Sequence, residues 1–379
     1  MNESSTELTN LLASQCQYQG GLSFQSFMEA ALYTPQLGYY QNHRIKFGPE
    51  GDFITAPYIS PLFGQCIAEF CYKHQKSLPQ DAILLELGAG DGRLAEDILN
   101  ALNKKNALPI EYWILEPSAF LQHEQKAHLK SALPEYFSQI KWLDSLPNTF
   151  NGIIIANEVL DALPVSQFRL NPHHGRIEEL FIYYDSTKGW FNHYDTPRTP
   201  HLIEVVTQSL SQLDAPLPYG YISEINLILP SFIKSFAEKL NQGMMLFIDY
   251  GFPRKEYYHP QRTLGTLMCH YRHKSHSNPL IHIGEQDITA HVDFTHLAEA
   301  AQLAQLDVLG YLNQAHFLIE NGLSDLLEPN LDYYTQIKQS QAIQTLTLPH
   351  EMGELFKVMI LGKDFNKEMG YQNDQRFRL

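Results

Sequence analysis

One stretch of this sequence, residues 83–99, constrains the fold more than any other. It opens with the apolar run 83–87 (Ile-Leu-Leu-Glu-Leu), which is typical of a buried parallel strand. Three glycines follow at alternate positions, namely Gly88, Gly90 and Gly92. Without side chains there, a ligand can approach the backbone closely. Apolar residues at helical spacing over 94–102 then predict a helix. This order predicts a nucleotide-type cofactor site, with a plain turn between strand and helix as the alternative.

The kind of cofactor follows from two acids and one missing glycine. The dinucleotide-binding fingerprint has its third glycine where this chain has Arg93. Glu86 and Asp91 bracket the glycine turn, and two carboxylates would repel a bound pyrophosphate. They suit a ligand with a cationic end and ribose hydroxyls. S-adenosylmethionine has both, so we expect Glu86, Asp91 and the three glycines to bind it.

Polar residues also follow the other predicted strands at their carboxyl ends. They are Glu116 after 112–115, Asp144 after 142–143, and Asn157-Glu158 after 153–156. Open α/β sheets bind ligands at this edge. We expect Glu116 to bind the ribose hydroxyls, Asp144 to accept from the adenine amino group, and Asn157 to lie near the cofactor. For Glu116 and Asp144, a helix cap or a solvated loop acid is the alternative.

A second group of acids, Glu158 and Asp161, lies in the segment N-E-V-L-D-A-L-P. If the turn after the strand is helical, the two carboxylates converge on one site. Such a pair can bind a cation, act as a general base or ligate a metal, and Asp161 as a helix cap is the alternative. Further along, His291 and Asp293 alternate with apolar residues and either line the active site or cap a helix from Thr295.

No metal site is predicted. His270, His273 and His276 lie three residues apart, but Arg272 and Lys274 stand between them. Because positive charges oppose the binding of a dication, we interpret this segment as a solvated or anion-facing loop.

The pattern of strands and insertions predicts the domain organisation. We expect a helical cap at 1–80, a sheet core formed by 81–165 and 236–379, and an inserted subdomain at 166–235, with a second insertion at about 252–290. Alternating aromatic residues over 183–194 predict antiparallel strands. Helices are expected at 24–32, from Pro61, at 203–213 and at 315–327, and the last two strands at 307–311 and 355–361.

Composition and charge narrow the class of protein further. The formal net charge of −15 over 379 residues makes general attraction to nucleic acid phosphates unfavourable. The four cysteines form no CxxC pair, which is typical of a reducing compartment. No apolar run is long enough to span a bilayer, and the segment MNESSTELTN has neither the arginines nor the apolar core of a leader. We therefore expect a cytoplasmic protein without membrane insertion.

Six motifs in order resemble a known family, the MidA-type class I S-adenosylmethionine-dependent methyltransferases. They are GDFITAPYISPLFGQCIAEF, LLELGAGDGRLAEDIL, ANEVLDALPV, DYG, DITAHVDF and MGELFKVMI. The resemblance implies an α/β, Rossmann-like sheet of seven strands in the order 3-2-1-4-5-7-6 with strand seven antiparallel. It implies that Gly88, Gly90 and Glu116 contact the cofactor and that segment 51–64 closes over it. The residues of that segment placed near the cofactor are Gly51, Asp52, Thr55, Ser60 and Gly64. Tyr58 departs from the family, which commonly has Glu there.

The resemblance also implies a reaction, because mitochondrial members are similar to protein arginine methyltransferases that modify a respiratory complex I subunit. We therefore expect methyl transfer to a protein arginine, with Glu158 and Asp161 orienting the guanidinium and Glu224, His291 and Asp293 as weaker candidates. A protein substrate, with a complex I subunit as one candidate, is the expected partner, and a homodimer is one option. Methylation of a small molecule and a non-catalytic assembly factor that binds S-adenosylmethionine are the alternatives.

Overall fold

The computed structural model describes residues 3–44, 46, 48, 51–52, 55–327, 331–365 and 368–379. Phe53 and Ile54, which belong to the predicted cofactor-covering segment, lie outside these residues. The chain divides into two compact units. One, here called the core unit, comprises 54–159, 230–251 and 297–379, and the other, here called the insertion unit, comprises 1–53, 160–229 and 252–296. The division into a cap at 1–80, a core and two insertions stays a prediction.

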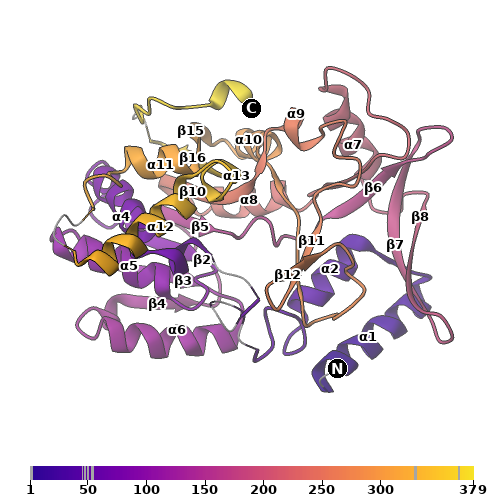
Figure 1. Ribbon diagram of the computed structural model, residues 1–379, viewed down its shortest axis with the longest axis horizontal. Helices are drawn as coiled ribbons and strands as arrows, with labels where there is room; N and C mark the ends of the chain where they lie inside the picture. Colours follow the sequence, from indigo (N-terminus) through magenta and orange to yellow (C-terminus); the bar gives the residue numbers. More distant parts are fainter. Residues whose placement is uncertain are drawn as a thin grey trace. The chain divides into compact units, whose positions relative to one another are not determined.

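Seven strands of a mixed sheet form the centre of the core unit (Figure 1). Their order is β4-β3-β2-β5-β10-β16-β15, which confirms the predicted 3-2-1-4-5-7-6. Strand β16 runs antiparallel to both β10 and β15, while β4, β3, β2, β5 and β10 are parallel. The bounds are β2 Ile83–Leu87, β3 Tyr112–Leu115, β4 Ile140–Leu143, β5 Phe150–Asn157, β10 Leu240–Phe252, β15 Asp307–Asn313 and β16 Phe356–Lys363.

The core strands are buried because their neighbours cover both faces. Every residue of β2 is buried, and so are Ile153, Ile154 and Ile155 of β5, as expected for parallel strands between helical layers. The helices of this unit are α3 Ala56–Ile59, α4 Pro61–Gln75, α5 Arg93–Lys104, α6 Ala119–Ala132, α8 Leu229–Ala237, α10 Phe294–Leu303, α11 Gln314–Glu320, α12 Tyr333–Thr347 and α13 Met352–Leu355, with short 3₁₀ turns at Phe137–Gln139 and Arg376–Arg378.

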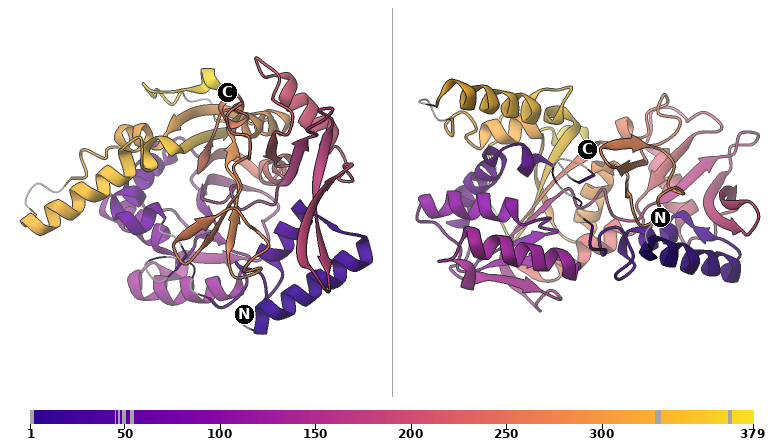
Figure 2. Two further views of the ribbon diagram at one scale, coloured as in Figure 1. Left: turned by 45° about the vertical axis from the view of Figure 1, so that its right-hand side comes forward. Right: turned by 60° about the horizontal axis from the view of Figure 1, so that its bottom comes forward.

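One predicted helix of the core unit is wrong in extent. The helix expected over 315–327 ends at Glu320, because Asn321 and Gly322 form its carboxyl-terminal cap and Gly322 has a φ of 87°. Helix α12 was not predicted. Its first turns project from the rest of the unit in Figure 2, with Tyr333 and Tyr334 exposed. A helix that buries little has no apolar stripe to reveal it.

The insertion unit contains two antiparallel sheets. One has five strands, β1-β7-β6-β9 with β8 beside β7, and the other has the order β12-β11-β13. The pairing of β7 with β8 confirms the strands predicted over 183–194, and α2 and α7 confirm two predicted helices. The bounds are α1 Glu3–Gln19, β1 Leu22–Ser23, α2 Phe24–Tyr33, β6 Ser166–Leu170, β7 Ile177–Asp185, β8 Gly189–Asp195, α7 Leu202–Ser211, β9 Ile222–Ile225, α9 Arg254–Tyr257, β11 Met268–Tyr271, β12 Lys274–His276, β13 Asp287–Thr289 and β14 Val292–Asp293.

The histidine-rich segment interpreted as a loop is a β-hairpin instead. Tyr271 pairs with Lys274, so Arg272 and His273 form a two-residue turn, and both have positive φ, 49° and 59°. This is the geometry that matches the twist of paired strands. Neither residue is glycine, so no turn signal is visible at these positions.

Candidate active site

The glycine turn of the core unit has the backbone that the sequence predicts. Gly88, Gly90 and Gly92 have φ of 61°, 58° and 90°, a left-handed region that costs other residues about 1–2 kcal/mol each. At Gly92 a Cβ atom would lie 3.3 Å from Cγ of Leu129 in α6. Residues with side chains are therefore disfavoured at all three positions, and α6 packs against the turn at Gly92. The absence of side chains allows a ligand to approach the backbone of the turn.

Glu86 stands at the end of β2 and is fully buried in the core unit. Its Oε2 accepts a 2.7 Å hydrogen bond from the Tyr112 hydroxyl. Burial raises the pKa of Glu86 to about 7, the Tyr112 hydrogen bond lowers it, and the charges of Asp91 and Glu116 raise it further. A carboxyl group with this pKa is poised to become ionised when a cation is placed beside it.

Glu116 follows β3, and two protein donors hold its carboxylate. Its Oε1 accepts from the Ser118 backbone N–H at 2.9 Å, and its Oε2 from Nε2 of Gln125 at 3.3 Å. Asp144 follows β4 and is exposed. Both acids therefore lie at the carboxyl ends of adjacent parallel strands, where the sequence places them.

Gln125 of α6 is a residue that the sequence reasoning missed. It is fully buried, on a face that it shares with Leu121 and Leu129. Besides Glu116, its Nε2 donates to the Gly90 carbonyl at 2.9 Å, and its Oε1 accepts from the Trp142 indole N–H at 2.9 Å. A polar residue in the middle of an apolar helical stripe was the available signal.

Tyr58, at the position where the family resemblance implies glutamate, contacts the glycine turn. Its hydroxyl donates to Asp91 at 2.5 Å, and the Arg93 guanidinium lies 4.4 Å from the centre of its ring. Burial and the Asp91 carboxylate raise the pKa of Tyr58 to about 12, so the hydroxyl stays protonated and can donate. A tyrosine here supplies a hydrogen bond where a glutamate would face Asp91 with a like charge.

The predicted cofactor residues of α3 and α4 have local contacts that explain their positions. Thr55 precedes α3, and the Ser60 side chain accepts from the Leu62 N–H at the start of α4. Gly64 faces α5, where a Cβ atom would lie 2.5 Å from Cβ of Asp97. Gly64 thus permits close packing of α4 on α5, and a contact with the cofactor stays a prediction.

Asn157 and Glu158 form the end of β5. Oδ1 of Asn157 is buried with no hydrogen-bond partner among the described residues, an atom that fits a donor from a ligand. Glu158 has a φ of 53°, and its N–H donates to the Ile248 carbonyl at 2.9 Å. The next residue, Val159, donates its N–H to Asp249 at 3.2 Å.

In the insertion unit, Asp161 and Asp287 are buried neighbours. Burial raises the pKa of Asp287 to about 8, and the nearby Asp161 charge adds to this rise. The Tyr40 hydroxyl donates to both oxygens of Asp287, at 2.9 and 3.0 Å. Asp161 also accepts, through its backbone carbonyl, from the Ala290 N–H. This arrangement favours a protonated Asp287 near neutral pH, beside the buried Asp161.

Gly51 and Asp52, predicted near the cofactor, are also buried in the insertion unit. Asp52 accepts from the Tyr39 hydroxyl at 2.9 Å and from the Arg272 N–H at 2.6 Å, and its backbone carbonyl accepts from the His273 N–H. Asp52 therefore holds the strained turn of the β11–β12 hairpin. Its role at the cofactor stays a prediction.

Three of the weaker catalytic candidates, Glu224, His291 and Asp293, line one small cavity of the insertion unit. Its volume of about 20 Å³ has room for only one or two water molecules. Asp293 caps α10 by accepting from the Thr295 and His296 N–H groups and pairs with Arg254 at 3.2 Å. The contacts thus match the capping alternative for Asp293, and its catalytic role stays a prediction.

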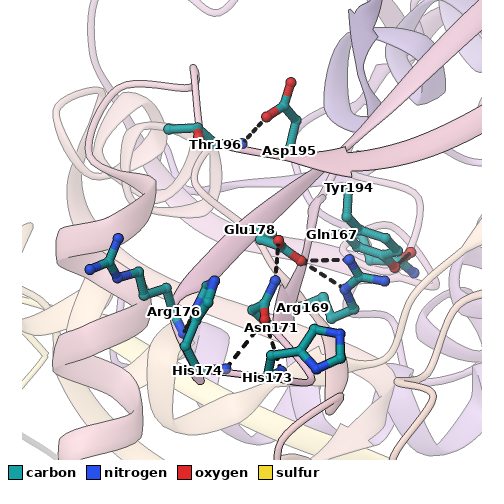
Figure 3. Close-up of polar contacts among 10 residues, drawn as sticks. All are labelled: Gln167, Arg169, Asn171, His173, His174, Arg176, Glu178, Tyr194, Asp195 and Thr196. Atoms are coloured by element: carbon teal, nitrogen blue, oxygen red, sulfur yellow. Dashed lines mark hydrogen bonds and ion pairs between the residues drawn. The ribbon is translucent and has the colours of Figure 1, made fainter.

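Glu224 is the inner end of a polar network in the insertion unit. Its carboxylate accepts from the N–H and hydroxyl of Thr266 and from Nε2 of Gln167. Gln167 in turn accepts from Tyr194, whose ring lies under the Arg169 guanidinium (Figure 3). Protein donors therefore surround Glu224, which favours a structural role. No group of three or more His, Cys, Asp or Glu residues suited to a metal occurs in the described part of the chain.

S-adenosylmethionine fits the residues of the core unit. The glycine backbone provides close approach, the Glu116 carboxylate suits the ribose, and Oδ1 of Asn157 and the Glu86 and Asp91 carboxylates suit the cationic end. The dinucleotide alternative lacks its third glycine.

Comparison with known proteins agrees with S-adenosylmethionine as the cofactor. Residues 66–312 match the family described as "Putative S-adenosyl-L-methionine-dependent methyltransferase". The chain is 30% identical to the Drosophila melanogaster protein arginine methyltransferase NDUFAF7 homolog, mitochondrial, over 90% of this chain and 82% of that protein. It is 27% identical to the human protein arginine methyltransferase NDUFAF7, mitochondrial, over 90% and 80%.

A solved structure is similar over nearly the whole chain. It is a superfamily member from Burkholderia thailandensis bound to S-adenosyl-homocysteine, with a TM-score of 0.92 and 34% identity, covering 99% of this chain and 97% of that one. The match confirms both the predicted fold and the predicted cofactor. The chain belongs to the MidA-type family of class I S-adenosylmethionine-dependent methyltransferases.

Proposed function

We propose that this protein transfers a methyl group to a nitrogen of an arginine side chain in a protein substrate. Two curated relatives of the same family carry the name protein arginine methyltransferase, and the chain covers at least four fifths of each. A subunit of respiratory complex I is the acceptor that the family resemblance favours, and the cytoplasm is the proposed compartment. Among the described residues, no helix is long and apolar enough to cross a membrane.

The chemistry requires that the acceptor be oriented rather than strongly activated. Bound S-adenosylmethionine supplies a methyl group on a positively charged sulfur. A guanidinium has a pKa above 12 and five N–H donors in a fixed plane. Carboxylates that accept two of these donors fix the plane and direct one terminal nitrogen. The product guanidinium keeps its charge, and the proton displaced from the methylated nitrogen leaves to a carboxylate or to water.

The backbone of Glu158 is the observation that carries the proposal. A left-handed conformation at a non-glycine residue costs about 1–3 kcal/mol and persists only where surrounding contacts impose it. The N–H groups of Glu158 and Val159 are both held by β10, through the Ile248 carbonyl and the Asp249 carboxylate. Strain of this kind concentrates at functional sites, which supports Glu158 as the residue that orients the acceptor.

Asp161 is the second proposed carboxylate. It is 5% exposed and lies near Asp287, whose pKa of about 8 reflects burial and the Asp161 charge. Two buried carboxylates in proximity are unfavourable in the absence of a cation. A guanidinium placed beside them would relieve this repulsion.

Transfer of labelled methyl groups tests the proposal. Purified protein and labelled S-adenosylmethionine are incubated with lysate protein, and labelled sites are located by mass spectrometry. Label on arginine is expected, and label on metabolites alone would favour the small-molecule enzyme. S-adenosyl-homocysteine binding without transfer to any acceptor would favour the assembly factor.

Substitution of Glu158 by Gln tests the assigned residue. We expect turnover to fall about 100-fold or more while calorimetric affinity for S-adenosyl-homocysteine stays within about twofold. Glu135→Gln, at an exposed position of the same unit, is the matched control and should change neither. Loss of cofactor affinity in Glu158→Gln would assign this residue to the cofactor instead.

A further inference from the structure

We propose that Gln125 is a positioning residue of the cofactor site. Its side chain fixes the glycine turn, Glu116 and strand β4 relative to one another. The inference rests on the cofactor site alone and does not depend on the arginine proposal. Gln125 is fully buried in α6, and its side-chain bonds reach the glycine turn after β2, Glu116 after β3 and Trp142 in β4. Nothing in the sequence motif around it, A-F-L-Q-H-E-Q, marks it as a ligand-binding segment.

The three bonds link the segments that follow β2 and β3 with strand β4 itself. Nε2 of Gln125 donates to the Gly90 carbonyl in the glycine turn and to Oε2 of Glu116 after β3. Oε1 accepts from the Trp142 indole in β4, two residues before Asp144. An amide offers two N–H donors and a carbonyl acceptor, and the geometry uses both kinds of group.

Packing reinforces these bonds. A Cβ atom at Gly92 would lie 3.6 Å from Cα of Gln125 and 3.3 Å from Cγ of Leu129, so α6 packs directly on the glycine turn. The position of α6 therefore fixes the Gln125 side chain, and the hydrogen bonds of this side chain fix the glycine turn and Glu116. Glutamine fits because it satisfies an anion, a carbonyl and an N–H at once, which no apolar side chain can do.

The Glu116 contact has a specific consequence for the ligand. A carboxylate that binds two ribose hydroxyls must keep its plane fixed, and Ser118 N–H and Gln125 each hold one of its oxygens. Loss of the Gln125 bond would let the carboxylate turn and would leave the Gly90 carbonyl without this donor. We expect weaker binding of any ligand that contains the adenosine group.

Calorimetry with S-adenosyl-homocysteine tests the proposal in the variant Gln125→Met. Affinity is expected to fall at least about tenfold, the effect of losing a hydrogen bond to a charged group. The matched control is Gln314→Met, which removes another fully buried glutamine of the core unit whose Nε2 donates to the Leu346 carbonyl at 3.0 Å. The control should lower thermal stability but leave affinity within about twofold. Equal affinity losses in the two variants, or none in Gln125→Met, would overturn the proposal.

A double-mutant cycle separates positioning from general stability. In a Glu116→Ala background, Gln125→Met should cost clearly less affinity than in the wild type, because part of its effect acts through Glu116. Identical losses in both backgrounds would overturn this link.

A second variant, Gln125→Glu, tests the proposal even if Gln125→Met does not fold. Its protonated side chain can still donate, whereas its carboxylate would repel Glu116. Relative to wild type, its affinity should therefore recover as pH is lowered from 8 to 5, and a constant ratio would contradict the assignment.

Discussion

Buried acids of the core unit and of the insertion unit are held in different ways. In the core unit, the Glu86 side chain accepts from the Tyr112 hydroxyl, and Glu116 stands at a strand end beside the glycine turn. In the insertion unit, Glu224 accepts from Thr266 and Gln167, and Asp293 pairs with Arg254 and caps a helix. The difference teaches that burial alone does not mark a functional acid. The donors around Glu224 and Asp293 tie these two acids to the surrounding backbone, whereas Glu86 and Glu116 are the acids proposed to face the cofactor.

The largest expected effect is a loss of stability on substitution of Asp293, and it tests the contrast between the two groups of acids. The Arg254–Asp293 pair is almost fully buried, with side chains 3% and 10% exposed, so Asp293→Ala removes the carboxylate beside a buried guanidinium. We expect the free energy of unfolding to fall by about 3–5 kcal/mol and the affinity for S-adenosyl-homocysteine to stay unchanged in the folded protein. Urea unfolding and calorimetry measure the two quantities.

The neighbouring pair Lys255–Asp214 is the control for that prediction. It has similar chemistry at 63% and 81% exposure, and Asp214→Ala should cost less than about 1 kcal/mol. If Asp293→Ala kept full stability but lost turnover, Asp293 would belong with the functional acids and the comparison would fail.

In contrast to Asp293→Ala, Glu116→Ala should lower cofactor affinity rather than stability. Two hydroxyl hydrogen bonds to a charged group are lost, so affinity for S-adenosyl-homocysteine should fall roughly 100-fold while stability changes little. Glu111→Ala is a suitable control, since Glu111 precedes the same strand and bonds to Lys141 and Trp113 instead. Unchanged affinity in Glu116→Ala would remove this acid from the cofactor site.

The sequence predicts the core unit better than the insertion unit for a physical reason. Parallel strands buried on both faces appear as apolar runs, so the core strands themselves were predictable from the residues. Their order was implied by the family resemblance, and the role of Glu116 at the cofactor stays a prediction. The β11–β12 hairpin has a turn of Arg272 and His273 that depends on Asp52, some 220 residues away in sequence. Such a contact leaves no local pattern. Gln125 was missed because its one sequence signal, a polar residue within an apolar helical stripe, does not show which groups the side chain bonds to.

The pH dependence of stability sharpens the comparison within the core unit. Burial raises the pKa of Glu86 from 4.5 to about 7. Between these values the folded protein holds a proton that the unfolded chain has lost, so the free energy of unfolding falls as pH rises. Glu86→Gln removes this dependence and should be more stable than wild type at pH 8, by roughly 1–3 kcal/mol, but nearly equal at pH 5. Urea unfolding at both pH values checks this, and an equal difference at both would show that burial of the charge is not the cause.

The smallest expected effect concerns Gly64, where packing and cofactor binding make different predictions. An alanine Cβ would lie 2.5 Å from Cβ of Asp97, and such overpacking costs about 1–3 kcal/mol. Alanine also favours a helix over glycine by up to about 1 kcal/mol, so Gly64→Ala should lose only about 1 kcal/mol in urea unfolding. Gly310→Ala, whose Cβ would have no contact closer than 3.4 Å, controls for the substitution itself. If Gly64 serves helix packing, affinity for S-adenosyl-homocysteine stays within about twofold. A tenfold loss of this affinity with unchanged stability would instead indicate that the α4 backbone contacts the cofactor. In that case the added methyl group would fit the fold but would clash with the ligand.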